Sequence, residues 1–287
     1  MQPHQLLHQV VFHLRLPRAG NAFITGGCLA LSGCLLQSVL RNPLADPTIL
    51  GVAGGASVFA LIALIAMLSW PLVMMMSGIG ALLTLLLLIV IVQRSGHFNP
   101  TRVLLCGLIL CTGFGAIISF LLITQQQSTL TGMLFWLMGG LHNQAFFMPG
   151  FCLLSLCFLF SLFRAKSLDI LLHGETHAKS LGIHTNRLQW QLLCISAILT
   201  ATAVTLAGPI GFIGLLVPHT LRLLGLRTHR VLLPAAVLAG GSLLTLADTI
   251  ARTAWQPLSL PVGIIMAVLG VPLLLCLLLR MQRGVSC

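Results

Sequence analysis

The stretch LVMMMSGIGALLTLLLLIVIVQ, residues 72–93, carries no charged side chain over its whole length. An α-helix needs about 20 mainly apolar residues to cross the hydrocarbon core of a bilayer. The length and composition of this stretch therefore predict a transmembrane helix, and they decide the class of fold.

Comparable apolar runs fill nearly the whole chain, separated by Gly, Pro, Arg and His. We place these runs at residues 19–40, 49–70, 72–93, 103–123, 145–163, 188–207, 212–224, 231–253 and 262–281. They predict an all-α, polytopic membrane protein of about nine transmembrane helices in a single domain, residues 1–287. The run at 212–224 is too short to cross a core of about 30 Å and follows Gly208-Pro209-Ile210-Gly211, so we expect a broken or half-length helix there.

The overall composition excludes an ordinary soluble protein. The chain is 57% hydrophobic and 7% charged, whereas a soluble domain carries about a quarter charged residues. Its net charge of +11 would favour nucleic-acid binding in a soluble protein. Here the cations stand at the ends of apolar runs, which indicates topology signals, and no nucleic acid is expected as a partner.

The distribution of Lys and Arg predicts the orientation in the membrane. With nine alternating spans, one set of loops carries twelve of the fifteen cations and the other set carries Arg15, Arg18 and Arg252. Because cytoplasmic loops are enriched in Lys and Arg, the C-terminus is predicted to be cytoplasmic and the N-terminus external. No removable leader is expected at the start.

The apolar runs form a group of four, a connector at 145–163 and a second group of four. Equivalent helices are then five spans apart, so structurally related groups must be inverted relative to each other. Inverted repeats are a known transporter architecture.

The longest polar stretch, RAKSLDILLHGETHAKSLGIHTNR at 164–187, holds two of the four acidic residues and both lysines. We expect a short helix in it, ended by Gly182, and a docking site for a partner protein; a solvated connector is the alternative. His173 and His177 are spaced for one helical face, but without a convincing third ligand no metal site is predicted.

Two other classes of membrane protein fit the residues less well. A secondary transporter or channel, the alternative function, needs ionisable residues along its path, yet Asp46, Asp169, Glu175 and Asp248 stand near predicted segment ends. A membrane enzyme lacks paired carboxylates or a nucleophile set, so no catalytic residue is expected. The nine cysteines are interpreted as small buried apolar residues.

A series of ordered motifs identifies a family. These motifs are Arg15-Leu-Pro-Arg18, Leu31-Ser-Gly-Cys-Leu-Leu-Gln37, Arg41-Asn-Pro-Leu-Ala-Asp-Pro47, Gly208-Pro-Ile-Gly-Phe-Ile-Gly214, Val217-Pro-His219, His229-Arg-Val-Leu-Leu-Pro234, Leu246-Ala-Asp248 and Leu260-Pro-Val-Gly263. Together they resemble the permease family of ABC importers for iron siderophores, haem and cobalamin, over residues 15–280. Within the family, residues 135–140 and 211–225 look most like the cobalamin permease, but siderophore and haem permeases carry close variants.

The resemblance implies a set of partners. They are a second identical permease or a sister permease, two cytoplasmic ATPase subunits, and a periplasmic or extracellular substrate-binding protein. The chain has no phosphate-binding loop of its own, so ATP and Mg are expected on the partner ATPase, and no cofactor is expected on this chain. The implied location is the bacterial cytoplasmic (inner) membrane.

The resemblance also assigns roles to particular residues. The family's ATPase-coupling segment matches Gly174, Glu175, Ala178, Lys179, Leu181 and Gly182. In that segment we expect Ala178 and Leu181 to offer a small apolar face, and Glu175 and Lys179 to form an i, i+4 pair.

Binding-protein docking is implied for Arg15, Arg18 and Arg252, since the arginine fork can hold a carboxylate bidentately. Headgroup anchoring is the alternative for each, and an ion pair with Asp248 is another for Arg252.

Structural roles are expected for the remaining motif residues. Asn42, Pro43 and Asp46 form a turn in which Asp46 caps the next helix. Helix breaks and packing are expected at Gly208, Pro209, Gly211, Gly214, Pro218, His219 and Asp248. The family pattern has one more helix before Arg15, so we expect either a start codon placed too late or a shortened variant.

Overall fold

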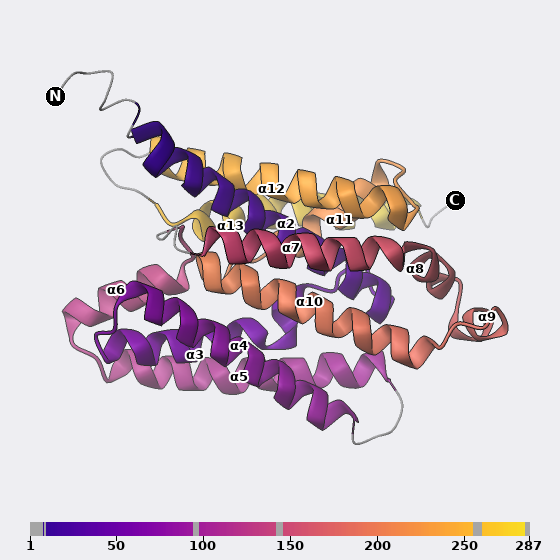
Figure 1. Ribbon diagram of the computed structural model, residues 1–287, viewed down its shortest axis with the longest axis horizontal. Coiled ribbons are helices and arrows are strands. Elements are labelled where there is room, and N and C mark those ends of the chain that lie inside the picture. The colour runs from indigo at the N-terminus through magenta and orange to yellow at the C-terminus, as the bar shows by residue number, and fades with distance from the viewer. Residues whose placement is uncertain (1–7, 9, 94–97, 142–145, 255–259, 285–287) are drawn as a thin grey trace.

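The structure, a computed structural model, describes residues 8, 10–93, 98–141, 146–254 and 260–284, and over these residues it contains helices and no strands (Figure 1). The elements are η1 (Val10–Arg15), α2 (Leu16–Leu40), η2 (Pro47–Leu50), α3 (Val52–Ile65), α4 (Trp70–Gln93), α5 (Pro100–Ile123), α6 (Gln127–Leu137), α7 (Phe147–Phe163), α8 (Ala165–Leu172), α9 (Glu175–Ser180), α10 (Thr185–Ala207), α11 (Ile213–Leu223), α12 (His229–Thr253) and α13 (Val262–Gly284). The predicted all-α class is confirmed.

Each of the nine predicted apolar runs overlaps a helix. Among the described helices, α2, α4, α5, α10 and α12 are long and apolar enough to span a bilayer, and α7 with α8 forms a pair bent by 58°. Shorter apolar helices are α3, α11 and the part of α13 up to Cys276. The chain is thus a multi-pass membrane protein; the count of nine spans stays a prediction.

Three details differ from the sequence analysis. Helix α6 was not predicted, because its 11 residues are too few for a span and include polar Ser and Thr. The second apolar run breaks at Ala66, and α4 begins at Trp70. The polar loop 164–187 contains two helices, α8 and α9, instead of one, and α10 begins inside its predicted limits.

Helix α2 lies at the centre of the molecule and is almost entirely buried. It packs against α7, α10, α11 and α12. Glycines allow the close approach: a Cβ on Gly33 would collide with the Gly214 carbonyl of α11, and one on Gly26 with the Gly240 carbonyl of α12. Small residues at such crossings are the usual means of tight helix packing in membranes.

The contacts support the predicted grouping into two inverted sets. Helix α2 packs against α11 and α12 of the second group, while α10 packs against α3 and α4 of the first. The Glu175 carboxylate lies 3.6 Å from Arg41 at the end of α2 and 3.0 Å from Gln189 near the start of α10, so the leading helices run in opposite directions. Inverted groups require this arrangement. At the crossing of α2 and α10, the Ser32 hydroxyl lies 2.7 Å from Ser196 Oγ and 2.9 Å from Thr200 Oγ1.

Candidate functional site

The two predicted partner-binding regions lie at opposite ends of the helix bundle, joined by α12 (Figure 1). His229, the first residue of α12, contacts Asp169 of α8, and Asp248, near its other end, contacts Arg18 of α2. At about 1.5 Å per residue, His229 and Asp248 are separated by roughly 28 Å along the helix axis. That length is close to the thickness of a bilayer core.

One end carries a cluster of arginines around a buried carboxylate. Arg18 donates bidentately to Asp248, with Nε 3.0 Å from Oδ2 and Nη2 2.8 Å from Oδ1. Arg252 Nε lies 3.3 Å from Oδ2, and the Asp248 side chain is 4% exposed. The i, i+4 pair with Arg252 is therefore found. The pair with Arg18 was not predicted, because 230 residues separate the partners.

This arrangement changes what each arginine offers to a partner. One carboxylate is shared between Arg18 and Arg252, so the cluster keeps a net positive charge. Arg15, the last residue of η1, is exposed, and no ion pair to it is found among the described residues. Arg15 is the cation of this group most available to a carboxylate from outside.

The other end carries the predicted coupling segment, which projects from the bundle as α8 and α9. Gly174 and Gly182 flank α9 with φ of +118° and +78°. A Cβ at either position would meet no neighbouring atom, so lack of space does not explain these glycines. The reason is the positive φ, which glycine adopts without strain.

The prediction that Ala178 contributes to an exposed apolar face of α9 is wrong. Ala178 is fully buried, because the chain folds back after α9 and Ile183 N donates to the Ala178 carbonyl at 3.0 Å. Leu181, by contrast, is 56% exposed, and Lys179 is also exposed. Among the predicted coupling residues, Lys179 of α9 and Leu181, which follows α9, therefore have the side chains most open to a partner.

The predicted pair of Glu175 with Lys179 is not formed either. Glu175 Oε1 accepts a hydrogen bond from Gln189 Nε2 at 3.0 Å and lies 3.6 Å from Arg41 Nη2. The carboxylate turns toward α10 and α2 because both supply a donor. Glu175 thus attaches the start of α9 to the membrane helices.

A partly buried hydrogen-bond network between α8 and the membrane helices was not predicted from the sequence. His229 Nδ1 lies 2.6 Å from Asp169 Oδ1, and the His229 backbone N–H donates to the same oxygen at 2.9 Å. His229 Nε2 lies 2.7 Å from Ser38 Oγ. Arg222 donates to Gln37 Oε1 at 3.0 Å and to Ser38 Oγ at 3.4 Å. The network joins α8, α12, α2 and α11.

The chemistry of these partners constrains which nitrogen of His229 carries a hydrogen. An ionised Asp169 can only accept, so Nδ1 of His229 carries a hydrogen and donates it. In neutral His229, Nε2 is then an acceptor, and the single hydrogen of the Ser38 hydroxyl is shared between Nε2 at 2.7 Å and the Cys34 carbonyl at 2.8 Å. Asp169 also satisfies a backbone N–H in the first turn of α12, where a negative charge is favourable. A signal was present in the His229-Arg-Val-Leu-Leu-Pro234 motif, but its partner 60 residues away cannot be inferred from sequence.

The turn between α2 and η2 forms as predicted. Asp46 caps η2 by accepting from the Thr48 backbone N–H at 2.8 Å and the Thr48 hydroxyl at 2.6 Å. Burial raises the pKa of the Asp46 carboxyl, and the hydrogen bonds with Thr48 partly oppose that rise. Asn42 precedes Pro43 in the turn. Its side-chain Oδ1 accepts a hydrogen bond from the Leu44 backbone N–H at 3.0 Å.

The glycine-rich motif before α11 packs against this turn and against the end of α6. Gly208, just before Pro209, has φ +70°, and Gly140 N donates to the Ala207 carbonyl at 2.8 Å. Phe212, which follows Gly211, also has a positive φ of +71°. The short α11 that follows has 11 residues and buries Gly214, Pro218 and His219, so the expected half-length helix is found.

The loop histidines do not assemble a metal site. The His173 and His177 rings are 6.5 Å apart, and His173 Nδ1 is bonded to the Asp169 carbonyl at 2.9 Å. In the described part of the chain, no three His, Cys, Asp or Glu side chains converge to hold a metal ion.

Comparison with known proteins gives consistent matches. The model of the FecCD transport family matches residues 1–280. The chain is 39% identical to a cobalamin import system permease protein of Halobacterium salinarum, over 94% of this chain and 73% of that one. It is 37% identical to a hemin transport system permease protein of Yersinia pestis, over 94% and 83% of the two chains. Its structure is similar to a metal-chelate type ABC transporter in an inward-facing conformation, with a TM-score of 0.90, 31% identity, and coverage of 98% and 90%.

Proposed function

Because this chain belongs to the FecCD transport family, we propose that it is the membrane-spanning permease subunit of a binding-protein-dependent ABC importer. The observation that carries the proposal is the TM-score of 0.90 with a metal-chelate type ABC transporter over 98% of the chain. The cargo is an iron chelate, namely a siderophore complex or haem, or else cobalamin. Relatives named for cobalamin and for hemin support this range of large chelates.

The proposed assembly uses both ends of the bundle. The permease dimerises with a second copy or a sister permease, two ATPase subunits bind the α9 end, and the substrate-binding protein docks on the arginine cluster. ATP and Mg are held by the ATPase subunits. The excess of Lys and Arg in the α9-side loops supports a cytoplasmic position for α9 and for the C-terminus in the bacterial inner membrane.

Coupling is proposed to run through α8 and α9. Leu181 and Lys179 face the ATPase, while Glu175 and the buried Ala178 hold α9 on the permease. The network from Asp169 through His229 and Ser38 to Arg222 then links α8 to three membrane helices. A rigid, satisfied network of this kind can carry a displacement of α8 and α9 into the bundle.

Uptake into proteoliposomes tests the function. The permease is reconstituted with its cognate ATPase and binding protein, and labelled cobalamin, haem and a ferric siderophore are compared. We expect one chelate to accumulate, and accumulation to stop when the ATPase carries an inactivating substitution. Uptake that continues without ATP hydrolysis would instead identify a secondary transporter.

Leu181→Ser tests the contact of α9 with the ATPase. Removing an exposed apolar anchor should weaken ATPase binding about tenfold, because a central apolar contact contributes 1 kcal/mol or more. Leu172→Ser, at another exposed leucine on the adjacent α8, is the matched control and should bind normally. Pull-down titrations of the ATPase measure both. Equal affinities for the two variants would remove Leu181 from the interface.

Arg15→Glu tests docking of the binding protein. Reversing the charge of this exposed residue should reduce affinity about tenfold, and more at low salt, since exposed charges are screened as ionic strength rises. Arg102→Glu, an exposed arginine at the start of α5, is the control. Surface plasmon resonance at two salt concentrations gives the result. Unchanged affinity of Arg15→Glu would leave headgroup anchoring as its role.

A further inference from the structure

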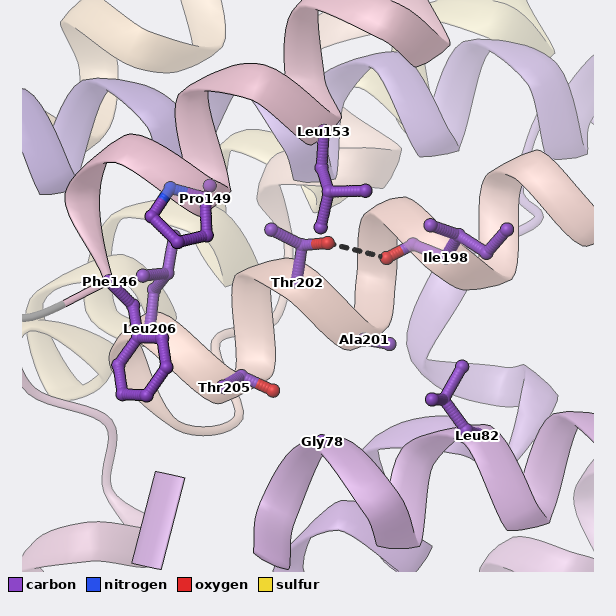
Figure 2. A pocket seen from close by; sticks show the side chains of 11 residues that line it. Gly78, Leu82, Phe146, Pro149, Leu153, Ile198, Ala201, Thr202, Thr205 and Leu206 are labelled. Atoms are coloured by element: carbon purple, nitrogen blue, oxygen red, sulfur yellow. Dashed lines mark hydrogen bonds between the residues drawn. The ribbon is translucent and has the colours of Figure 1, made fainter. Parts of the chain in front are cut away.

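Two cavities along α10 differ in their chemistry. The first lies between α4, α7 and α10, has a volume of about 360 Å³ and is lined mainly by apolar side chains (Figure 2). The second, of about 410 Å³, lies at the start of α10, beside α9. We call it the α10 entry cavity. It is lined by Lys179, Gly182, Ile183, His184, Thr185 and Asn186.

A threonine hydroxyl in the α10 entry cavity has no partner within the chain. In the first cavity, by contrast, the Thr202 hydroxyl donates to the Ile198 carbonyl one turn earlier, at 2.9 Å (Figure 2). Thr185 is the first residue of α10, so no carbonyl of the helix stands one turn before it. Thr185 is 3% exposed, and no hydrogen bond to its hydroxyl is found among the described residues. Because buried hydroxyls in folded proteins nearly always have a partner, this one points to a group that enters the cavity.

The start of α10 supplies further hydrogen-bond donors. No side chain of the described residues caps this helix, and its first turn holds no acidic residue. The first N–H groups of a helix have no acceptor within it, and none outside it is found in the described part of the chain. The Asn186 side-chain oxygen accepts from the Phe98 N–H at 3.0 Å, which leaves the NH₂ group of Asn186 to donate. Uncapped N–H groups at a helix start favour an anion.

The α10 entry cavity also has a cation and lacks an acidic side chain. Lys179 lines it from the last turn of α9. The ammonium, hydroxyl, NH₂ and backbone N–H groups of the lining can all donate. All four acidic residues of the sequence are described, and none of them lines the cavity. Glu175, the acidic residue of α9, is bonded to Gln189 and lies beside Arg41. An ionised carboxylate, which only accepts, complements this set of donors.

We propose that the α10 entry cavity receives one carboxylate side chain, an Asp or a Glu, of the ATPase subunit. This inference rests on the proposed function, in which α9 and the turn after it contact the ATPase. The cavity includes Lys179 and Gly182, on either side of Leu181, whose side chain is 56% exposed. A protein seated on Leu181 therefore reaches the cavity.

The carboxylate accepts hydrogen bonds from the Thr185 hydroxyl and from the first N–H groups of α10, and the Lys179 ammonium balances its charge. Hydrogen bonds of this kind, between donors and an ionised acceptor, are stronger than those between neutral groups. The ATPase thereby supplies the N-terminal cap that α10 lacks within its own chain. This cap joins the ATPase directly to a membrane helix, in addition to its contact with α9.

Thr185→Val tests the hydroxyl without disturbing the fold. Valine has nearly the shape of threonine but cannot donate a hydrogen bond. Because the Thr185 hydroxyl has no partner within the chain, its removal should not lower the thermal midpoint of the permease alone. The affinity for the ATPase should fall about tenfold, since a hydrogen bond to a charged group is lost. Thr185→Ser keeps the hydroxyl and should retain most of the affinity. Pull-down titrations of the cognate ATPase on the full-length permease measure both variants.

Carbodiimide cross-linking identifies the carboxylate. A carbodiimide activates a carboxyl group and joins it directly to an amine in contact with it, without a spacer. In the complex with the ATPase, we expect Lys179 to be joined to one Asp or Glu of the ATPase, which mass spectrometry locates. Lys166, the exposed lysine of α8, does not line the cavity and should not be joined to that residue. Replacing the identified residue with its amide should weaken binding as Thr185→Val does, and the two changes together should cost little more than either alone.

The outcomes separate this proposal from its alternatives. Equal ATPase affinities for Thr185→Val and Thr185→Ser would overturn it. A lower midpoint for Thr185→Val in the permease alone would also overturn it, because the hydroxyl would then belong to the fold. If no cross-link from Lys179 forms in the complex, but inorganic phosphate protects Lys179 of the permease alone from acetylation, the cavity binds a free anion instead. An ATPase that does not bind the unaltered permease would contradict the proposed function itself, so the two failures are distinguishable.

Discussion

Gly33→Ala is expected to destabilise the protein by about 3 kcal/mol, the upper end of the range for overpacking a close contact. The added Cβ would collide with the backbone carbonyl of Gly214, which cannot move aside as a flexible side chain could. Helices α2 and α11 would have to separate, and α2 is the most buried helix among the described spans. The thermal midpoint of the detergent-solubilised protein, followed by fluorescence-detected size exclusion, measures the loss.

Gly113→Ala on α5 is the matched control for this prediction. Gly113 is also in a helix, but a Cβ there meets no atom within 4 Å. Replacing an unconstrained helix glycine with alanine stabilises by about 0.5–1 kcal/mol. The two variants should therefore shift the midpoint in opposite directions. A fall of equal size in both would mean that packing of α2 on α11 is not the cause.

The fold class could be predicted from sequence because bilayer solvation imposes long apolar helices. Helix α6 escaped prediction because, with 11 residues and several hydroxyls, it lies below the length that this constraint selects. The short α11 was foreseen because Gly208 and Pro209 interrupt the apolar run before it. The length of an apolar run and the residues that break a helix are local properties, so they can be predicted from the sequence.

The sites were predictable where partners are local in sequence. The pair of Asp248 with Arg252 follows from i, i+4 spacing. The stronger bidentate pair of Asp248 with Arg18 depends on the packing of α2 against α12, which no spacing rule gives. Glu175 shows the opposite error: its local partner Lys179 was expected, but Gln189 and Arg41 compete successfully because tertiary packing brings them closer.

The orientation of α9 could not be read from its sequence. A helix of six residues has less than two turns, so its pattern does not specify which face is inward. The structure buries Ala178 and exposes Leu181. The proposed contact with an ATPase therefore involves the end of α9 and the turn after it, instead of a face formed by Ala178 and Leu181 together.

Asp169→Ala is expected to reduce uptake per ATP hydrolysed about tenfold while leaving ATPase binding intact. The change removes the acceptor shared by the His229 ring and the His229 backbone N–H. It leaves a fully buried imidazole without its charged partner, at a cost of about 1–3 kcal/mol. α8 then loses its attachment to α12 and, through Ser38 and Arg222, to α2 and α11.

The measurements for this variant must separate coupling from stability. Asp169→Asn keeps an acceptor oxygen and should restore most of the uptake, whereas Asp169→Ala should not. In parallel, the thermal midpoint and ATPase affinity are recorded for both. If Asp169→Ala lowers the midpoint but transports normally per ATP, the network is a structural support alone. If instead the ratio of uptake to ATP hydrolysis falls while the thermal midpoint and the ATPase affinity stay the same, neither unfolding nor loss of the ATPase explains the fall. The bond between Asp169 and His229 then transmits force from α8 into the membrane helices.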